Sequence, residues 1–214
     1  MIAPLLACDR SEKIAPPARP SITPARAGQG ELFELTRLDP SIRLDIRYAT
    51  ANNFTGRTLY DQPRAFLVQP AAKALARAHK AAAAEGYGLT IFDAYRPWRI
   101  TKALWDATPP GQQRNYVANP KKGSKHNRGC AVDLSLHRLD TGALVEMPSG
   151  YDEFTERAHR DFMAASPEAI ANRARLEGWM EAEGFRGISN EWWHFDFAGW
   201  EDFPILDIAF DEIG

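Results

Sequence analysis

Two stretches of alternating apolar and polar residues organise this sequence. From residue 130 to residue 137, apolar side chains alternate with small or polar ones, and Asp133 falls on the polar face. From residue 193 to residue 197, aromatic residues alternate with His194 and with an aspartate. A period of two predicts a half-buried β-strand in each stretch. Each predicted strand therefore carries a side chain that is able to bind a metal ion.

Three other segments favour helices. Residues 71–85 are rich in Ala, Lys and Arg, which are good helix formers, and Pro70 stands before them at a position where a helix tolerates proline. A second helix is predicted over residues 98–107. Ser166, followed by Pro167, is typical of a helix start and predicts a third helix that runs to about Glu183 and ends at Gly184.

Shorter strands complete the predicted fold. Alternating apolar residues predict strands at 33–35 and 42–46, and an apolar run predicts another at 89–92. A turn signal at 140–142 predicts a hairpin in which residues 144–147 pair back. We therefore predict an α+β fold in a single domain, with a mainly antiparallel sheet, helices packed on one side of it and a functional site in a cleft.

Composition and charge narrow the class of protein. The chain has 214 residues, of which 44% are hydrophobic and 25% charged, as in an ordinary globular protein. We assign residues 31–214 to one domain. The formal net charge of -2 gives no reason to expect nucleic acid or an anionic surface as a partner. No apolar run approaches the length that is needed to span a membrane.

Residues 1–30 differ from the rest of the chain. Residues 9–30 hold four prolines, at positions 16, 17, 20 and 24, which are typical of a flexible tether. Leu5-Leu6-Ala7-Cys8 resembles the cleavage box of a bacterial lipoprotein signal, which would make Cys8 a lipid anchor in the periplasm or cell envelope. The residues before it lack the basic and apolar regions of a signal peptide. Two interpretations stay open: a truncated signal, or a chance tetrapeptide in a cytoplasmic protein.

The candidate chemistry lies around the two main strands. Gly129 permits a sharp turn that can fold His126 back beside Asp133. Together with His194, these residues would give zinc three protein ligands and leave a fourth position for water, as a catalytic site requires. Glu191 would then be free to act on that water. The alternative is a polar loop before a strand that carries an aspartate by chance.

The spacing of Glu191 and His194 raises a geometric question. Residues three apart lie on opposite faces of an ideal strand. For both to reach one site, the backbone must bulge or twist near Trp192, or the strand must begin after Glu191. His137 shares the face of Asp133, but four residues along a strand is about 13 Å. We therefore exclude His137 from the same metal.

Four blocks of this sequence resemble the VanX-type D-alanyl-D-alanine dipeptidases, a family of zinc enzymes that split D-Ala-D-Ala. Together they span roughly residues 45 to 200, in the order that the family has. They are Tyr48-Ala49-Thr50 with Asn53-Phe54-Thr55-Gly56, Asp93-Ala94-Tyr95-Arg96-Pro97, Ser124 to Asp133 continued through Arg138-Leu139-Asp140-Thr141-Gly142, and Glu191-Trp192-Trp193-His194. The resemblance implies the same α+β architecture.

The resemblance also implies roles for the residues of the chemical step. It makes His126, Asp133 and His194 the ligands of one zinc ion per chain. It makes Glu191 the catalytic base, and it implies that Arg96 stabilises the transition state.

Other residues are implied to hold the substrate. Tyr48 and Asp152 correspond to residues that hold its ammonium group, and Ser124 would contact its free carboxylate. One departure is Lys125, which stands where the family pattern has a second serine. Lys125 therefore changes the expected recognition of the carboxylate and is itself a candidate to contact it.

The function expected from these residues is zinc-dependent hydrolysis of the dipeptide D-Ala-D-Ala to two D-alanines. A D,D-carboxypeptidase that trims longer cell-wall peptides would use the same metal site and stays open. A non-enzymatic zinc-binding module is a third candidate, but a purely structural zinc needs neither Glu191 nor Arg96. The chain has no Gly-x-Ser-x-Gly motif, which argues against a serine hydrolase of that type.

Overall fold

The structure is a computed structural model that describes residues 30–111 and 116–214. The predicted tether, with the proposed lipid anchor at Cys8, lies outside the described residues except for its last residue, Gly30. Within the described ranges, none of the helices combines the length and the apolar character that crossing a membrane requires.

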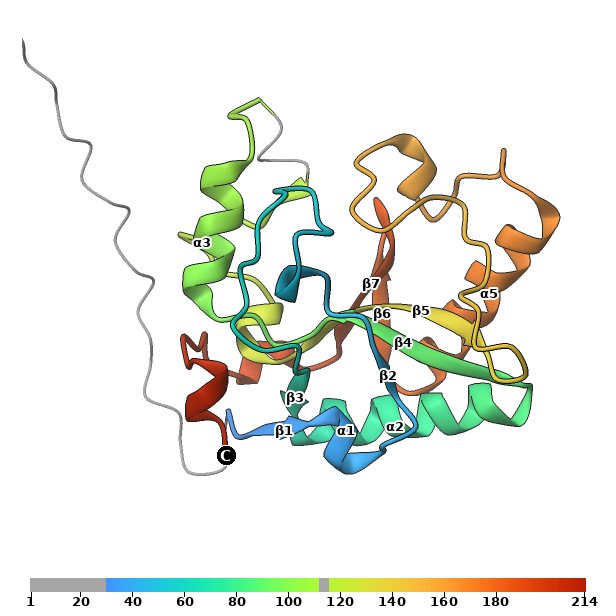
Figure 1. The fold of residues 1–214 in the computed structure, drawn as a ribbon, viewed down its shortest axis with the longest axis horizontal. Helices are drawn as coiled ribbons and strands as arrows, with labels where there is room; N and C mark the ends of the chain where they lie inside the picture. The colour runs from blue at the N-terminus through green and yellow to red at the C-terminus, as the bar shows by residue number, and fades with distance from the viewer. Residues whose placement is uncertain (1–29, 112–115) are drawn as a thin grey trace, which may run out of the picture.

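A five-stranded sheet forms the centre of the molecule (Figure 1). Its spatial order is β2-β4-β5-β7-β6, in which only the β2–β4 pair is parallel. The strands are β2 (Arg43–Leu44), β4 (Tyr87–Asp93), β5 (Ala131–Arg138), β7 (Glu191–Phe197) and β6 (Phe185–Ile188). A separate antiparallel pair joins β1 (Leu32–Glu34) to β3 (Phe66–Val68). The predicted α+β architecture with a mainly antiparallel sheet is confirmed.

Two long helices cover the sheet. Helix α2 (Gln69–Ala84) contacts β4 and also α5 (Pro167–Ala182), and α5 contacts β5 and β6. In Figure 1, α2 runs below β4 and α5 stands beside the sheet, whereas α3 (Trp98–Ala107) lies apart from both. The buried face of α2 is built from small residues, which lets the helix lie close to the strands. Its buried apolar residues are Ala71, Ala72, Ala74, Leu75, Ala78 and Ala82.

The central strand is more deeply buried than the sequence predicts. The first seven residues of β5 are all buried, including those on the face predicted to be polar. The reason is that other parts of the fold cover its faces: α5 packs against β5, and His126 and Tyr151 contact Asp133. Polar side chains on β5 must therefore find partners inside the protein, because burial removes most of their contact with water.

Several short elements differ from the prediction. The expected strand at 33–35 ends at Glu34, and Leu35 begins the one-turn helix α1 (Leu35–Leu38). The expected strand at 42–46 is reduced to β2, and a 3-10 turn (Arg47–Ala49) follows it closely. Residues 144–147 pair back only through a single bridge between His137 and Leu144. Strand β6 has no counterpart among the predicted strands.

Candidate metal centre and its pocket

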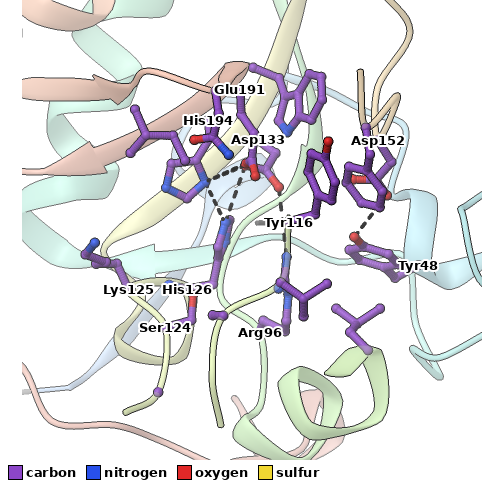
Figure 2. Close-up of a pocket in the computed structure, with 18 of the residues that line it drawn as sticks. Tyr48, Arg96, Tyr116, Ser124, Lys125, His126, Asp133, Asp152, Glu191 and His194 are labelled. Atoms are coloured by element: carbon purple, nitrogen blue, oxygen red, sulfur yellow. Dashed lines mark hydrogen bonds and ion pairs between the residues drawn. The ribbon is translucent and has the colours of Figure 1, made fainter. Parts of the chain in front are cut away.

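Three side chains from separate elements meet at one point (Figure 2). His194 Nδ1 lies 2.9 Å from Asp133 Oδ1 and 3.2 Å from His126 Nε2. His126 Nε2 lies 3.4 Å from the same Asp133 oxygen. All three residues are buried. The structure thus brings the three predicted metal ligands together from a turn and two neighbouring strands.

A glycine turn places His126 beside β5. The 3-10 turn His126–Arg128 ends at Gly129, which adopts the left-handed conformation with φ 65° and ψ 26°. A side chain there would be strained, and its Cβ would come within 2.7 Å of Leu32. The predicted sharp turn is therefore present. Beyond it the chain enters β5, where Asp133 pairs with His194 of β7.

A bulge in β7 brings Glu191 and His194 to one site. On β6, Ile188 pairs with Glu191, but the residue before it, Gly187, pairs with Phe195. The residues from Trp192 to His194 lie between these two pairs, so the alternation of faces is broken. Glu191 Oε2 consequently lies 3.9 Å from His194 Nδ1. The bulge is the first of the two alternatives left open by the sequence; the second is wrong, because β7 begins at Glu191.

The outer ring nitrogens of both histidines have partners. His126 Nδ1 donates to the carbonyl oxygen of Ala94 at 2.7 Å, and His194 Nε2 donates to Asp196 Oδ1 at 2.9 Å. Such bonds fix the tautomer in which the inner nitrogen carries a lone pair for a metal ion. We missed the role of Asp196, although its place two residues after His194 on one strand face is a visible signal.

The donor set fits zinc. Two imidazoles and one carboxylate are ligands that zinc accepts, and three protein ligands leave a position open. Tetrahedral ligands about 2.0–2.1 Å from zinc lie about 3.3 Å apart, close to the separations of 2.9, 3.2 and 3.4 Å observed here. The spacing of the three donor atoms therefore suits a zinc ion.

Arg96 is paired with Asp93, a residue that we did not predict as part of the site. Strand β4 ends at Asp93, and Arg96 stands three residues beyond it. Its Nε and Nη2 donate to Asp93 Oδ2 at 2.9 and 2.6 Å, and Nη2 lies 3.9 Å from Asp133 Oδ2. Tyr60 donates to the other Asp93 oxygen at 2.6 Å. Asp93 is fully buried, so it holds the guanidinium in one place.

Asp152 lies beside Tyr48 at the edge of the site. Tyr48 donates its hydroxyl to Asp152 Oδ2 at 3.0 Å, and the neighbouring Tyr151 donates to Asp133 Oδ2 at 3.1 Å. Burial, together with the negative charge of Asp133, raises the pKa of Asp152 well above its ordinary value. Asp152 also has φ 57°, a conformation that costs energy for a residue with a side chain. Tyr151 was not predicted as part of the site.

Glu191 has the electrostatic environment of a proton acceptor near neutral pH. Burial raises the pKa of its carboxyl to about 7, and the negative charge of Asp133 adds to the rise, against the opposing effect of His194. A general base works best when its pKa lies near the working pH. The place of Glu191 beside His194 and its raised pKa therefore both suit a general base.

Ser124 and Lys125 lie at the other side of the pocket. The Ser124 hydroxyl accepts a hydrogen bond from the His126 amide at 3.2 Å, which helps to form the turn. Lys125 Nζ lies 3.3 Å from Asp196 Oδ2 and 5.1 Å from the centre of the Trp200 ring. Lys125 is thus engaged with the carboxylate that orients His194, a partner the sequence did not suggest.

All the predicted site residues line one cavity of about 470 Å³. Figure 2 shows Ser124 and Lys125 on one side of the metal ligands and Tyr48 and Asp152 on the other. The cavity therefore has a cationic side and an acidic side, with the metal ligands between them. It is lined by Tyr48, Arg96, Ser124, Lys125, His126, Asp133, Asp152, Glu191 and His194, together with other side chains.

Comparison with known proteins gives consistent matches. A model of the peptidase M15 family, described as D-Ala-D-Ala dipeptidase, matches residues 29–207. The D-alanyl-D-alanine dipeptidase of Escherichia coli K12 is 40% identical over 176 residues, covering 82% of this chain and 89% of that protein. That of Enterococcus faecium is 38% identical over 190 residues, covering 77% and 93%. Among solved structures, the LD-carboxypeptidase LdcB aligns with a TM-score of 0.48 and 16% identity, covering 92% of this chain and 81% of that one.

Proposed function

The chain belongs to the D-Ala-D-Ala dipeptidase family of the M15 peptidases, and we propose that it hydrolyses D-Ala-D-Ala at one zinc ion per chain. The observation that carries the proposal is the convergence of His126, Asp133 and His194 beside Glu191, a carboxylate that stays outside the ligand set. When bound, zinc supplies Lewis-acid polarisation of the scissile carbonyl and activates water as the nucleophile.

Glu191 is the general base in this proposal. Its carboxylate takes a proton from the attacking water and delivers it to the leaving amine, so that one group serves both transfers. In the metal-free protein, burial raises the pKa of this carboxyl to about 7, within the range in which a carboxyl group both accepts and releases a proton near neutral pH. The bulge in β7 supports this role because it holds the Glu191 carboxylate beside the ligand cluster.

Arg96 stabilises the negative oxygen that develops during attack. Asp93 engages Nε and Nη2 of its guanidinium, which holds the charge rigidly at the cavity wall. A fixed donor that is placed before the reaction typically contributes about 3–4 kcal/mol to the transition state. Asp93 is a positioning residue here, because it acts through Arg96.

The two sides of the cavity match the two charges of a free dipeptide. Asp152 and Tyr48 hold the substrate ammonium, and the arrival of that cation favours the ionised form of Asp152 that burial disfavours. Ser124 contacts the free carboxylate. Lys125 supplies positive charge nearby, although its contact with Asp196 means that it serves the metal site as well.

The test combines a variant of Glu191 with two substrates. Glu191→Gln keeps the shape of the side chain but accepts no proton, so zinc content should stay at one per chain while turnover of D-Ala-D-Ala falls on the order of 10²–10⁴-fold. Glu156→Gln changes an exposed glutamate and serves as the control. Turnover of Glu191→Gln within a fewfold of the parent would refute the base role.

The second substrate separates the dipeptidase from the carboxypeptidase. N-acetyl-D-Ala-D-Ala lacks the ammonium that Asp152 and Tyr48 are proposed to bind. The parent protein should cleave free D-Ala-D-Ala and leave the acetylated analogue nearly untouched. Equal cleavage of both would favour a carboxypeptidase, and cleavage of neither by the zinc-loaded protein would favour a binding module.

A further inference from the structure

The bulge in β7 displaces backbone carbonyl groups from the regular ladder with β6. Between the pairs Ile188–Glu191 and Gly187–Phe195, the segment from Trp192 to His194 departs from the register of the two strands. Buried carbonyl groups that leave a ladder need other donors, and an unpaired one costs about 1–3 kcal/mol. The bulge that aligns Glu191 with His194 therefore depends on whatever satisfies these groups.

The side chain of Arg160 provides those donors. Its Nη2 donates to the carbonyl oxygens of Trp192 at 3.1 Å and His194 at 2.8 Å, and its Nε donates to that of Ile188 at 2.9 Å. One guanidinium thus connects β6, through Ile188, to the bulge of β7, through Trp192 and His194. Arg160 is not among the residues that line the cavity, so it reaches the site only through the backbone.

Further contacts hold the guanidinium in place. Its Nη1 lies 3.3 Å from Glu177 Oε1 on α5, and its carbon lies 4.3 Å from the centre of the Phe195 ring. The Arg160 amide also donates to the carbonyl oxygen of Ser189 at 2.9 Å. The side chain is only 11% exposed. A planar fork with fixed donor directions suits three carbonyl groups at once, which a lysine ammonium does not.

Gly187 makes the space that Arg160 occupies. A Cβ on Gly187 would lie 2.0 Å from the Arg160 guanidinium carbon and 2.2 Å from its Nε. The φ angle of Gly187 lies outside the left-handed region, so the backbone conformation itself does not demand glycine. The need for glycine comes from the guanidinium that lies against it.

We propose that Arg160 is a positioning residue for this enzyme, which holds the β7 bulge and so sets the placement of Glu191 and His194, with Gly187 as the gap that admits it. The inference rests on the proposed function for its kinetic consequences. Its consequence for metal binding depends only on His194 as a ligand. If Arg160 served only the stability of the fold, its loss would leave kcat and zinc affinity unchanged.

The experiment uses Arg160→Ala, Arg160→Lys, Gly187→Ala and the double variant Arg160→Ala/Gly187→Ala in the full chain. Zinc affinity is measured by competition with a chelator, and kcat and KM are measured at saturating zinc. Loss of a residue that orients a ligand typically weakens metal binding 10- to 100-fold. Arg160→Ala should show this loss together with a lower kcat and a KM within a fewfold of the parent. Arg160→Lys should fall between Arg160→Ala and the parent.

The glycine variants test whether the two positions act as one unit. Gly187→Ala should weaken zinc binding as Arg160→Ala does, because its Cβ displaces the guanidinium. In the double variant the added methyl group meets no guanidinium, so zinc binding should be no weaker than in Arg160→Ala alone. Arg157→Ala removes an arginine of the same segment that donates to the Pro148 carbonyl, and it should leave zinc binding unchanged.

Two outcomes would overturn the inference. One is a folded Arg160→Ala protein with parental zinc affinity and kcat and only a lower melting temperature. The other is a double variant whose losses are the sum of the single ones. If Arg160→Ala does not fold, Arg160→Lys and Gly187→Ala carry the same comparison. If the parent does not cleave D-Ala-D-Ala, the proposed function fails, while the zinc affinities still decide the role of Arg160.

Discussion

At the scale of single residues, the site holds carboxyl groups in contrasting environments. Burial raises the pKa of Glu191 to about 7. Asp133 is also buried, but its contacts with His126 and His194 outweigh the desolvation and lower its pKa below the ordinary range. A carboxylate that stays ionised suits a metal ligand, whereas one that titrates near neutral pH suits a proton carrier. The environments thus separate the two proposed roles.

The raised pKa of Glu191 predicts a cost in stability for the metal-free protein. Its folded-state value of about 7 exceeds the ordinary value of 4.5. Between these pH values the folded state binds more protons than the unfolded state, so the free energy of unfolding falls as pH rises through this window. Glu191→Gln removes the effect, and at pH 8 it should be more stable than the parent by about 1–3 kcal/mol.

The measurement is urea unfolding of both metal-free proteins at several pH values. At pH 4 the difference that comes from titration should be small, because Glu191 is then protonated in the folded state and mostly protonated in the unfolded state. The side chain is 15% exposed, which reduces the expected effect below the full value for the pKa change. A difference between the two proteins that does not change from pH 4 to pH 8 would contradict the prediction.

The pairing of Arg96 with Asp93 determines how Arg96 can be tested. Arg96→Ala would leave Asp93, which is fully buried, without its cation, at a cost of about 3–5 kcal/mol. Arg96→Lys keeps a charge for Asp93 but loses the planar fork. We expect Arg96→Lys to remain folded, with kcat lower by about 10²–10³-fold and KM within a fewfold of the parent. A raised KM with unchanged kcat would show that Arg96 binds the ground state.

At the scale of elements, local sequence predicted the helices well. The predicted helix at 98–107 coincides with α3, and α2 and α5 differ from their predictions only at the ends. Ser166 caps α5 by accepting a hydrogen bond from the Ala169 amide at 3.0 Å, as expected from its type and from the proline that follows. These elements were predictable because their signals lie within one or two helical turns.

Elements that depend on distant partners were less predictable. Strand β6 has only four residues, one of them Gly187, and it forms because β7 lies beside it. Both faces of β5 are buried because distant segments such as α5 and Tyr151 pack on it, and no local pattern contains those contacts. In the site, the ligand types were visible in the sequence. Asp93, Tyr151 and Arg160 acquire their roles only through contacts across the fold.

At the scale of the whole molecule, the C-terminal segment, residues 204–214, supports the site. The Leu206 amide donates to the carbonyl oxygen of Asn127, the residue after His126, at 2.8 Å. The Trp98 amide donates to the Leu206 carbonyl at 3.1 Å. Tyr95 donates to the Ile208 carbonyl at 3.1 Å and accepts from its amide at 2.8 Å. The segment thus connects the turn that carries His126 to the one that carries Arg96.

The two ends of the chain should therefore differ in how much they contribute to turnover and stability. All proposed site residues lie between Tyr48 and His194, and the family match begins at residue 29. We propose that residues 31–214 form the catalytic domain. Deletion of residues 1–29 should leave turnover and melting temperature unchanged. Deletion of residues 204–214 removes the buried side chains of Leu206 and Phe210, each worth about 1.5–3 kcal/mol, which is a large fraction of the stability of a typical domain.

Melting curves with and without zinc separate stability from metal binding in both truncated proteins. A ligand that binds only the folded state raises the melting temperature according to its concentration and affinity. The protein without residues 1–29 should show the parental rise at every zinc concentration. The protein without residues 204–214 should melt lower and show a smaller rise, because the turn that holds His126 has lost the hydrogen bond from Leu206 to Asn127. A parental zinc response in this second protein would show that the C-terminal segment stabilises the fold without shaping the metal site.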